Sequence, residues 1–437
     1  MIIRVHARWV LPIAAPVIRD GWVDVDPTRG EIVGVGAAGA PGPVPATTID
    51  LGHAAILPGL VNAHTHLELS HLAGRVPPAS SFVAWVRAML GVRFGAPTTM
   101  GEVVEAAATA IASAETAGTA AVGDIGNTDA AIGPLAASSL SGIHFREALG
   151  FKADDAGRIA SETRLGAMTA QGRLAEEGCA RVIASVAPHA PYSTSAPLIG
   201  ALSPGRPVTW FMTREQPACP VSSIHLAESP EELEFLSSGT GPFRDLLTDL
   251  GSWDPDWQAP GVAPVTYLQQ LGALHRDLLV VHGTQLTRPE LDVLAGVGAT
   301  LVLCPRSNRW VGAGVPPVAD AVAAGVRLAV GTDSLSSVAD LNVFAELAAL
   351  RAAAPAVPAA TLLRAATLGG AQALGLDHLG VLAPGASSRA VVRVPPADVE
   401  DVEEWLVADA ADTSDLRWLD TLVAGVGNRQ SGVDSGH

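Results

Sequence analysis

The sequence predicts an α/β fold, a closed (β/α)8 TIM barrel, with a small β-sandwich domain built from both termini. Eight short runs rich in Val, Ile, Leu and Ala recur between residues 56 and 333. Each run ends in polar residues, and an Ala-rich stretch of helical character usually follows it. Apolar strands separated by helices are typical of a parallel sheet covered on both faces, and eight of them favour closure into a barrel.

We expect these runs to be the barrel strands in chain order. They cover residues 56–62, 118–124, 142–147, 180–188, 221–227, 278–282, 300–304 and 326–333. The long interval between the fifth and sixth runs contains Gly, Pro and Trp residues around positions 239–264, which indicates an inserted loop. Two helical stretches, near 339–353 and 359–374, are expected after the last run.

Residues 56–379 are therefore predicted to form the catalytic barrel, and residues 1–55 together with 380–437 the small β domain. The first 55 residues hold short alternating stretches separated by turns, which is typical of strands. Short β-like stretches are also expected at 380–382 and 389–394.

Charge and composition exclude several classes of partner. The formal net charge is −17, and Lys152 is the only lysine. Nucleic acids and anionic membrane surfaces attract clustered positive charge, so we expect neither as a partner. No stretch of about 20 residues is apolar without interruption, so no membrane span is expected. The sequence instead favours a small-molecule substrate, and it leaves a homo-oligomer open.

Cysteine usage and the N-terminus both favour a cytoplasmic protein. The three cysteines, Cys179, Cys219 and Cys304, are widely spaced and form no CxxC pair, which argues against a disulfide framework. Pro12 and Pro16 interrupt the apolar run after the first arginines, and no small-residue cleavage site follows, so a signal peptide is not expected.

Polar residues follow almost every predicted strand. In chain order they are His64 and His66, Asp124, Arg146 and Glu147, His189, His225 and Glu228, His282, Arg306, and Asp333. Barrel enzymes build their sites at the carboxyl ends of the strands, where eight loops converge. The concentration of histidines at these ends therefore predicts an active site there.

The spacing of the histidines indicates a metal site. His64 and His66 are two residues apart, so both side chains point to one face of an extended strand. With His225 and Asp333 they make a His₃Asp set, which is typical of a catalytic ion that keeps an open position for water. Nitrogen and oxygen ligands suit one divalent ion, Zn²⁺ first, with Fe²⁺ or Mn²⁺ as alternatives. Such an ion lowers the pKa of bound water to about 7, which predicts hydrolytic chemistry.

Six motifs carry a resemblance to the amidohydrolase superfamily, and within it to the cytosine-deaminase/chlorohydrolase-like branch. They are LPGLVNAHTHLE (57–68), SVAPHAPYSTS (185–195), IHLAES (224–229), VVHG (280–283), LCPRSN (303–308) and VGTDS (330–334), in family order. The resemblance spans about residues 50 to 385. It implies a metal bound by His64, His66, His225 and Asp333.

The resemblance also implies roles for other residues. Glu228 would move protons to a ring nitrogen, His282 would orient the attacking water, and Asp333 would also act in catalysis. Trp85, Arg146 and His189 match positions that usually contact substrate. One departure lies after Gly385, where Ala386–Ala390 replaces the usual lysine and Ala-Asp-Leu turn and puts the C-terminal part of the β domain in doubt.

Alternatives remain for several of these residues. Many superfamily members hold two metals through a carboxylated lysine, but Lys152 lies too early in the chain to serve. Glu147 could bridge a second metal or simply pair with Arg146. Asp124 could face the barrel mouth or cap a loop. Two tryptophans of the inserted loop, 253 and 257, could roof the pocket or pack on the barrel exterior.

The predicted function is a metal-dependent hydrolytic deaminase of an adenine-type purine nucleoside derivative. The resemblance favours members that act on adenosine derivatives, with aminodeoxyfutalosine and S-adenosylhomocysteine first. A dechlorinase or cyclic amide hydrolase on the same site is the enzymatic alternative. A non-catalytic barrel homologue is the alternative of another class, which the complete ligand set and Glu228 disfavour.

Overall fold

The structure is a computed structural model that describes residues 1–203 and 220–431, with side chains described up to residue 425. The chain forms two compact units. The first consists of Met1–Asn62, Ala114–Ala121 and Asn342–His437, and the second of Ala63–Ser113 and Val122–Leu341. The domain boundaries expected at residues 55 and 380 stay a prediction. Among residues 1–203 and 220–431, no helix combines the length and hydropathy that a membrane span needs.

The predicted parallel strands form in the described residues as two four-stranded sheets. One sheet runs β6 (Leu60–Thr65), β7 (Thr119–Gly126), β8 (Ser141–Ala148) and β9 (Val182–Pro188). The other runs β10 (Ser222–Leu226), β11 (Leu278–His282), β12 (Thr300–Leu303) and β13 (Arg327–Val330). Thr65 bridges Asp333 in parallel, and the His225 amide donates to the His189 carbonyl at 2.9 Å. These two links join the sheets at both edges, as a closed barrel requires.

The first predicted strand is divided in the structure. Residues Ala55–Pro58 form β5, which belongs to a different sheet, and the barrel strand β6 begins at Leu60. The prediction of one strand over 56–62 is therefore wrong. Pro58 cannot donate to a strand ladder and Gly59 follows it, which explains the break. Because β6 extends to Thr65, His64 lies within the strand, one residue before its end.

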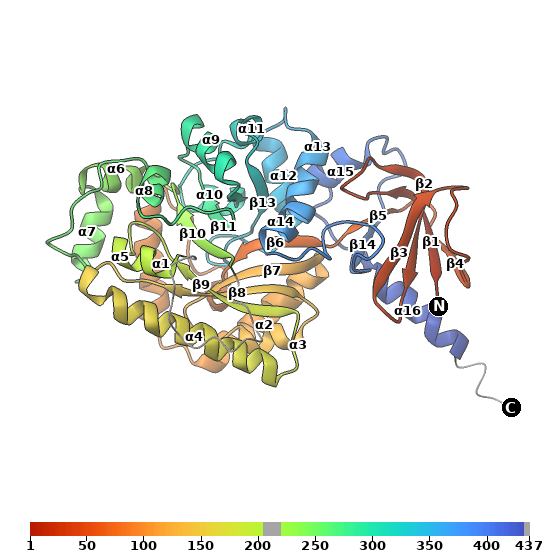
Figure 1. Cartoon of the computed structure of the whole chain (residues 1–437), viewed down its shortest axis with the longest axis horizontal. Helices are drawn as coiled ribbons and strands as arrows, with labels where there is room; N and C mark the ends of the chain where they lie inside the picture. The colour runs from red at the N-terminus through yellow and green to blue at the C-terminus, as the bar shows by residue number, and fades with distance from the viewer. Residues whose placement is uncertain (204–219, 432–437) are drawn as a thin grey trace. The chain divides into compact units, whose positions relative to one another are not determined.

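Helices cover the strands of the second unit. They include α1 (Phe82–Gly95), α3 (Ile132–Ala137), α4 (Ala156–Glu176), α5 (Ala196–Leu202), α6 (Pro230–Ser238), α7 (Pro242–Asp249), α8 (Pro264–Gln270), α9 (Arg288–Val297), α10 (Pro305–Trp310) and α11 (Val318–Ala324). Short 3₁₀ turns occupy Leu67–Leu72 and Ala153–Asp155, and α2 spans Met100–Thr116. In Figure 1, α4 lies along β8 and β9, where its buried alanines permit close packing.

The segment predicted as an inserted loop contains α7 and a cluster of aromatic rings. Trp257 stacks on Phe235 of α6 with ring centroids 4.7 Å apart, and Trp253 stacks on Phe151 at 5.8 Å. Phe243 of α7 reaches instead to Tyr192, with centroids 4.0 Å apart. The two tryptophans therefore pack against aromatic neighbours, and α7 contributes a ring beside a strand end.

The first unit holds strands from both termini in one mixed sheet. Its order is β15 (Arg417–Trp418), β14 (Ala390–Arg393), β5, β1 (Ile3–Val10), β2 (Ile18–Asp26) and β3 (Glu31–Ala37), and β4 (Thr47–Asp50) pairs with β1. The antiparallel β1–β2 register places Val5 opposite Val23, and Val392 of β14 lies opposite Ile56. These apolar residues belong to the buried core of the unit.

The C-terminal part departs from the predicted pattern in two places. Despite the unusual 386–390 segment, β14 forms and pairs with β5, whereas 380–382 is not a strand. Residues 400–431, predicted only as part of the small β domain and not as helices, contain α15 (Val402–Ala408) and α16 (Leu419–Ser431). The expected helical stretches are α12 (Val343–Ala353) and the run α13 (Ala359–Arg364), a π-turn (Ala365–Gly369) and α14 (Gly370–Ala373).

Of the three cysteines, Cys179 and Cys304 are buried and are not joined in a disulfide, and Cys219 lies outside the described residues.

Candidate metal centre

The HxH pair lies where the sequence places it, at the end of β6. His64 is fully buried, and the ring of His66 lies 4.9 Å from that of His64. Both Nε2 atoms face the same carboxylate oxygen, Asp333 Oδ1, at 3.8 Å from His64 and 3.5 Å from His66. Because residues two apart on a strand share a face, the pair converges on one point.

His225 and Asp333 complete the group from two other strand ends. The ring of His225 lies 4.9 Å from that of His64 and 5.5 Å from that of His66. The Nδ1 of His225 donates to the His189 carbonyl at 2.9 Å, which leaves Nε2 free to bind. The other oxygen of Asp333, Oδ2, accepts hydrogen bonds from Ser307 at 2.5 Å and Ser337 at 3.2 Å. These partners fix the side chains of His225 and Asp333 in one orientation.

The electrostatics of the cluster formed by His64, His66, His225 and Asp333 suit a cation. Burial lowers the pKa of His64 and of His225 well below the usual value, and the neighbouring histidines add to the effect. Both imidazoles are therefore neutral and keep a lone pair at neutral pH. Within the described residues, neither ring nitrogen of His64 has a hydrogen-bond partner. A divalent ion would satisfy one of these two buried nitrogens. The nitrogen and oxygen donors of the cluster fit such an ion.

The backbone is strained where the strands deliver these residues. Ala227, His282 and Asp333 are among the non-glycine residues of the described chain with positive φ, at 50°, 72° and 62°. Ala227 directly follows β10, His282 ends β11, and Asp333 lies three residues after the end of β13. Positive φ is costly for side-chain-bearing residues, and it persists at functional sites where the surrounding structure enforces it.

Glu228 is held from several directions beside the cluster. It is 3% exposed, and its Oε1 lies 3.5 Å from His282 Nε2. The Tyr192 hydroxyl donates to Oε2 at 3.3 Å, and the Glu228 amide donates to Glu232 Oε2 at 2.9 Å. The Thr284 hydroxyl donates to the Glu228 carbonyl. Burial raises the pKa of Glu228 well above its usual value, and the charge of Asp333 adds to the rise.

The two ring nitrogens of His282 have different surroundings. Its Nδ1 donates to Asn308 Oδ1 at 2.7 Å, so the unprotonated Nε2 faces Glu228. Burial lowers the pKa of His282, which favours this neutral form. Nε2 can therefore accept a hydrogen bond from water or from a protonated Glu228.

The three predicted substrate residues lie in different surroundings. The ring of His189 is 4.8 Å from that of His225, and its Nδ1 bonds Ser193 Oγ at 2.5 Å. Trp85 of α1 is 7% exposed, and in the described chain its Nε1 has no hydrogen-bond partner. Arg146 instead pairs with Asp129 at 3.1 Å, and a side chain added at Gly166 of α4 would meet it. The structure brings His189 to the cluster and directs Arg146 toward α4.

The alternatives for Asp124 and Glu147 are distinguished by their contacts. Asp124 is fully buried, accepts from the Leu67 amide at 2.9 Å and bonds His144 Nδ1 at 2.7 Å. It therefore caps the backbone that follows His66. Glu147 is not the partner of Arg146, because its Oε2 accepts from Asn127 at 2.9 Å.

Sequence reasoning missed Tyr192, Glu232 and Ser337 as partners of the site. Tyr192 lies three residues after His189 in the same motif, and that proximity was its only signal. Glu232 and Ser337 each follow a predicted site residue, Glu228 and Asp333, by four positions. Such spacing is common along helices, so it does not single them out.

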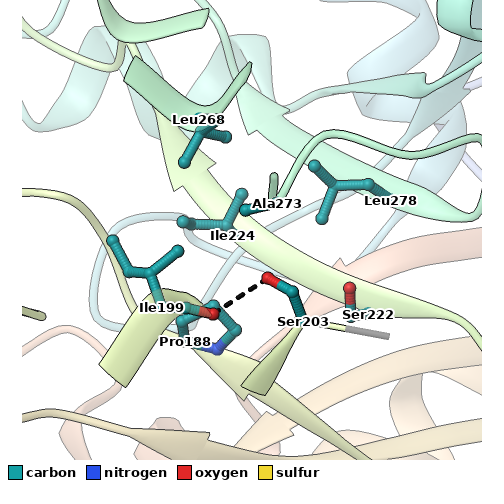
Figure 2. Close-up of a pocket in the computed structure, with 8 residues that line it drawn as sticks. All are labelled: Pro188, Ile199, Ser203, Ser222, Ile224, Leu268, Ala273 and Leu278. Carbon is teal, nitrogen blue, oxygen red and sulfur yellow. Dashed lines mark hydrogen bonds between the residues drawn. The ribbon is translucent and has the colours of Figure 1, made fainter. Parts of the chain in front are cut away.

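A small cavity elsewhere in the second unit lacks these features. Figure 2 shows its lining, which is mainly apolar and carries no ionisable side chain: Pro188, Ile199, Ser203, Ser222, Ile224, Leu268, Ala273 and Leu278. The Ser203 hydroxyl is bonded to the Ile199 carbonyl at 2.9 Å. This cavity offers no group for hydrolytic chemistry.

Comparison with known proteins agrees with this geometry. The profile described as "Amidohydrolase family" matches residues 55–394. An aminodeoxyfutalosine deaminase from Deinococcus radiodurans is 31% identical over 358 residues, which cover 78% of this chain and 79% of the relative. A 5-methylthioadenosine/S-adenosylhomocysteine deaminase from Halobacterium salinarum is 29% identical, over 82% of this chain and 77% of its own.

Solved structures share the fold. An adenosine deaminase from Xanthomonas campestris with bound zinc has a TM-score of 0.74 and 25% identity, with 99% of this chain and 98% of that chain covered. An atrazine chlorohydrolase from Arthrobacter aurescens, complexed with zinc, has a TM-score of 0.72 and 20% identity, with 93% and 91% covered. The second likeness, at its lower identity, concerns the fold alone.

Proposed function

Because this chain belongs to the amidohydrolase family, we propose that it is a metal-dependent hydrolytic deaminase of an adenine-type purine nucleoside derivative. The observation that carries the proposal is the convergence of His64, His66 and Asp333, with the His225 ring beside that of His64. A protonatable glutamate, Glu228, lies next to His282 at the same place. A metal centre accounts for hydrolysis, and Glu228 accounts for a ring nitrogen that must gain a proton. The relatives named as deaminases of adenosine derivatives support the same substrate class.

His64, His66, His225 and Asp333 would hold one divalent ion, and Zn²⁺ suits this donor set best, with Fe²⁺ or Mn²⁺ as alternatives. The bound ion would supply Lewis acidity, which lowers the pKa of water at the site. Zinc bound in the similar adenosine deaminase structure supports this choice.

Proton movement falls to the side chains around the cluster. Deamination adds water at the ring carbon, protonates the adjacent ring nitrogen and releases ammonia. Glu228 would donate to the ring nitrogen, because its raised pKa keeps the carboxyl protonated at higher pH than usual. Asp333 would accept the proton of the attacking water and pass it to the departing amine. His282, held by Asn308, would orient that water through Nε2.

The remaining predicted contacts concern substrate placement. His189 and Trp85 would bind the nucleoside, one through its imidazole and the other through its indole ring and free Nε1. The role of Arg146 in substrate binding stays a prediction from the family resemblance.

A substrate panel tests the proposal. Purified, zinc-loaded protein is incubated with adenosine, 5′-deoxy-5′-methylthioadenosine, S-adenosylhomocysteine and 6-chloropurine riboside, and the ultraviolet spectrum and ammonia are recorded. We expect conversion of at least one adenosine derivative to its 6-oxo product with release of ammonia. If each adenosine derivative stays unchanged while the chlorinated ring is hydrolysed, the deaminase assignment is wrong.

A variant isolates the proton donor in the same assay. Glu228→Gln keeps the size of the side chain and removes the transferable proton, so we expect turnover to fall by at least 100-fold with metal content unchanged. Glu162→Gln, on the exposed side of α4, is the matched control and should keep full activity. Loss of metal from Glu228→Gln would instead assign Glu228 to the metal site.

A further inference from the structure

One buried carboxylate beside the cluster has no role in the mechanism above. Glu147 lies near the end of β8 and is 9% exposed. Its Oε2 accepts from Asn127, but among the described residues its Oε1 is shielded from solvent and has no hydrogen-bond partner. A buried acceptor without a donor is destabilising, so such an atom is expected to meet a donor in a bound state.

The position of Glu147 places its carboxylate beside the site. A carboxylate oxygen of Glu147 and one nitrogen each of His189 and His225 all lie within 4.8 Å of one another. The side chain thus lies beside a proposed metal ligand and beside a histidine proposed to contact substrate. Arg146, its neighbour on β8, points away and is bound to Asp129.

Neither simpler explanation accounts for Glu147. It is not a partner for Arg146, whose guanidinium is paired elsewhere. A second cation is also disfavoured, because His225 Nδ1 is bound to the His189 carbonyl and its Nε2 belongs to the first set of ligands. Glu147 and His189 alone then remain, and two protein ligands are too few for a well-held transition-metal site.

We infer that Glu147 is a specificity-determining residue whose Oε1 accepts a hydrogen bond from an N–H or O–H group of the substrate. The inference rests on the proposed function and deepens it. An adenine nucleoside carries such donors only at the 6-amino group and on the ribose hydroxyls, since its ring nitrogens are acceptors. A buried carboxylate also repels anions, so a substrate with an anionic substituent near this position is disfavoured.

The test compares Glu147→Gln with the wild type on substrates that lack one donor at a time. The parent is the adenosine derivative of the panel with the highest kcat/KM. Its 2′-deoxy and 3′-deoxy analogues each lack one ribose hydroxyl, and its 6-chloropurine analogue lacks the 6-amino donor. Where the parent is adenosine or S-adenosylhomocysteine, 5′-deoxy-5′-methylthioadenosine serves as the analogue that lacks the 5′-hydroxyl or the ammonium group. Glu162→Gln serves as the matched control, and zinc content per chain is measured for every variant.

We expect Glu147→Gln to lower kcat/KM for the parent by roughly 10- to 100-fold, the range for a hydrogen bond to a charged acceptor, with zinc content unchanged. With the analogue that lacks the donor bound by Glu147, the wild type and Glu147→Gln should have the same kcat/KM. Equal values with a deoxy analogue identify the ribose as the donor, and equal values with the 6-chloro analogue identify the amino group.

Three results would overturn the inference. An equal loss with every analogue would mean that Glu147 only supports the fold, and no loss with any would mean that water alone meets Oε1. Loss of zinc would make it a metal ligand. Failure of the wild type on every adenosine derivative would instead refute the proposed function, which the panel reports separately.

Discussion

The approach of Gly331 to His64 provides a sharp test of how the metal centre is built. Gly331 follows β13 and lies against β6, so that a Cβ added there would meet His64 Cβ at 2.8 Å and the His64 carbonyl at 2.9 Å. Cys304 Sγ would be 3.0 Å away. Carbon atoms in ordinary contact lie about 3.5–4.0 Å apart, so Gly331→Ala requires a shift of roughly 0.7–1.2 Å. We expect His64 to be displaced.

The magnitude follows from the tolerance of metal ligands. Ligand distances in metal sites hold to about ±0.2 Å, so a displacement of this size weakens binding. Overpacking of this kind costs about 1–3 kcal/mol, which corresponds to roughly a 5- to 150-fold loss in zinc affinity if the strain falls on the bound form. The assay is zinc affinity by competition with a chromophoric chelator, with circular dichroism to verify folding.

Gly133→Ala in α3 is the matched control, because no atom lies within 4 Å of a Cβ added there. It should bind zinc as the wild type does. If Gly331→Ala folds and binds zinc with unchanged affinity, β6 and the chain after β13 can separate without cost. The close packing of Gly331 against β6 would then not set the position of His64.

Three further predictions concern groups around the cluster. Since the raised pKa of Glu228 keeps its proton to higher pH, kcat/KM should be lost as pH rises through that pKa; a pH profile with no alkaline limb would contradict a proton-donor role. Ser307→Ala removes one hydrogen-bond donor to Asp333 Oδ2, so we expect kcat/KM to fall about 10-fold, and to fall further in the double variant with Ser337→Ala. Wild-type kinetics in both variants would rule out that the two serines orient Asp333. Burial raises the pKa of Glu232 to about 7, so its contribution to stability is present below pH about 4.5 and lost as pH rises through 7, by up to about 3 kcal/mol. Urea unfolding between pH 5 and 8 should show a smaller decline for Glu232→Gln, and an equal decline in both proteins would exclude Glu232 as its source.

Local pattern was sufficient to predict the barrel and the convergence of His64, His66, His225 and Asp333. The two-residue spacing of His64 and His66 fixes their shared face, and the position of polar residues at strand ends fixes the shared edge. Asp333 could be included because it ends the last predicted strand. These inferences depend on strand geometry, which residues near in sequence determine.

Contacts between distant segments were not predictable in this way. Arg146 and Glu147 are adjacent on β8, so they face opposite sides, and the sequence does not say which one faces the site. The contact of Tyr192 was also not predictable. Its hydroxyl reaches Glu228 only because β9 and β10 end side by side. The close approach that requires glycine at 331 likewise depends on the packing of two strands far apart in the chain.

The boundary at Pro58–Gly59 illustrates a different limit. The apolar run through residue 62 is continuous in composition, but its first part pairs with β1 and β14 and its second part enters the barrel. Composition reports burial and not the sheet to which a strand belongs. The helices α15 and α16 were not predicted, although buried apolar residues such as Leu406 and Val423 mark one side of each.

A crystal structure of the zinc-loaded protein, with anomalous data collected at the zinc absorption edge, tests the central claim most directly. We predict one strong peak per chain, at a bonding distance of about 2.0–2.2 Å from one nitrogen each of His64, His66 and His225 and from Asp333 Oδ1. A peak held instead by Glu147 and His189, or no peak in fully active crystals, would contradict the assignment.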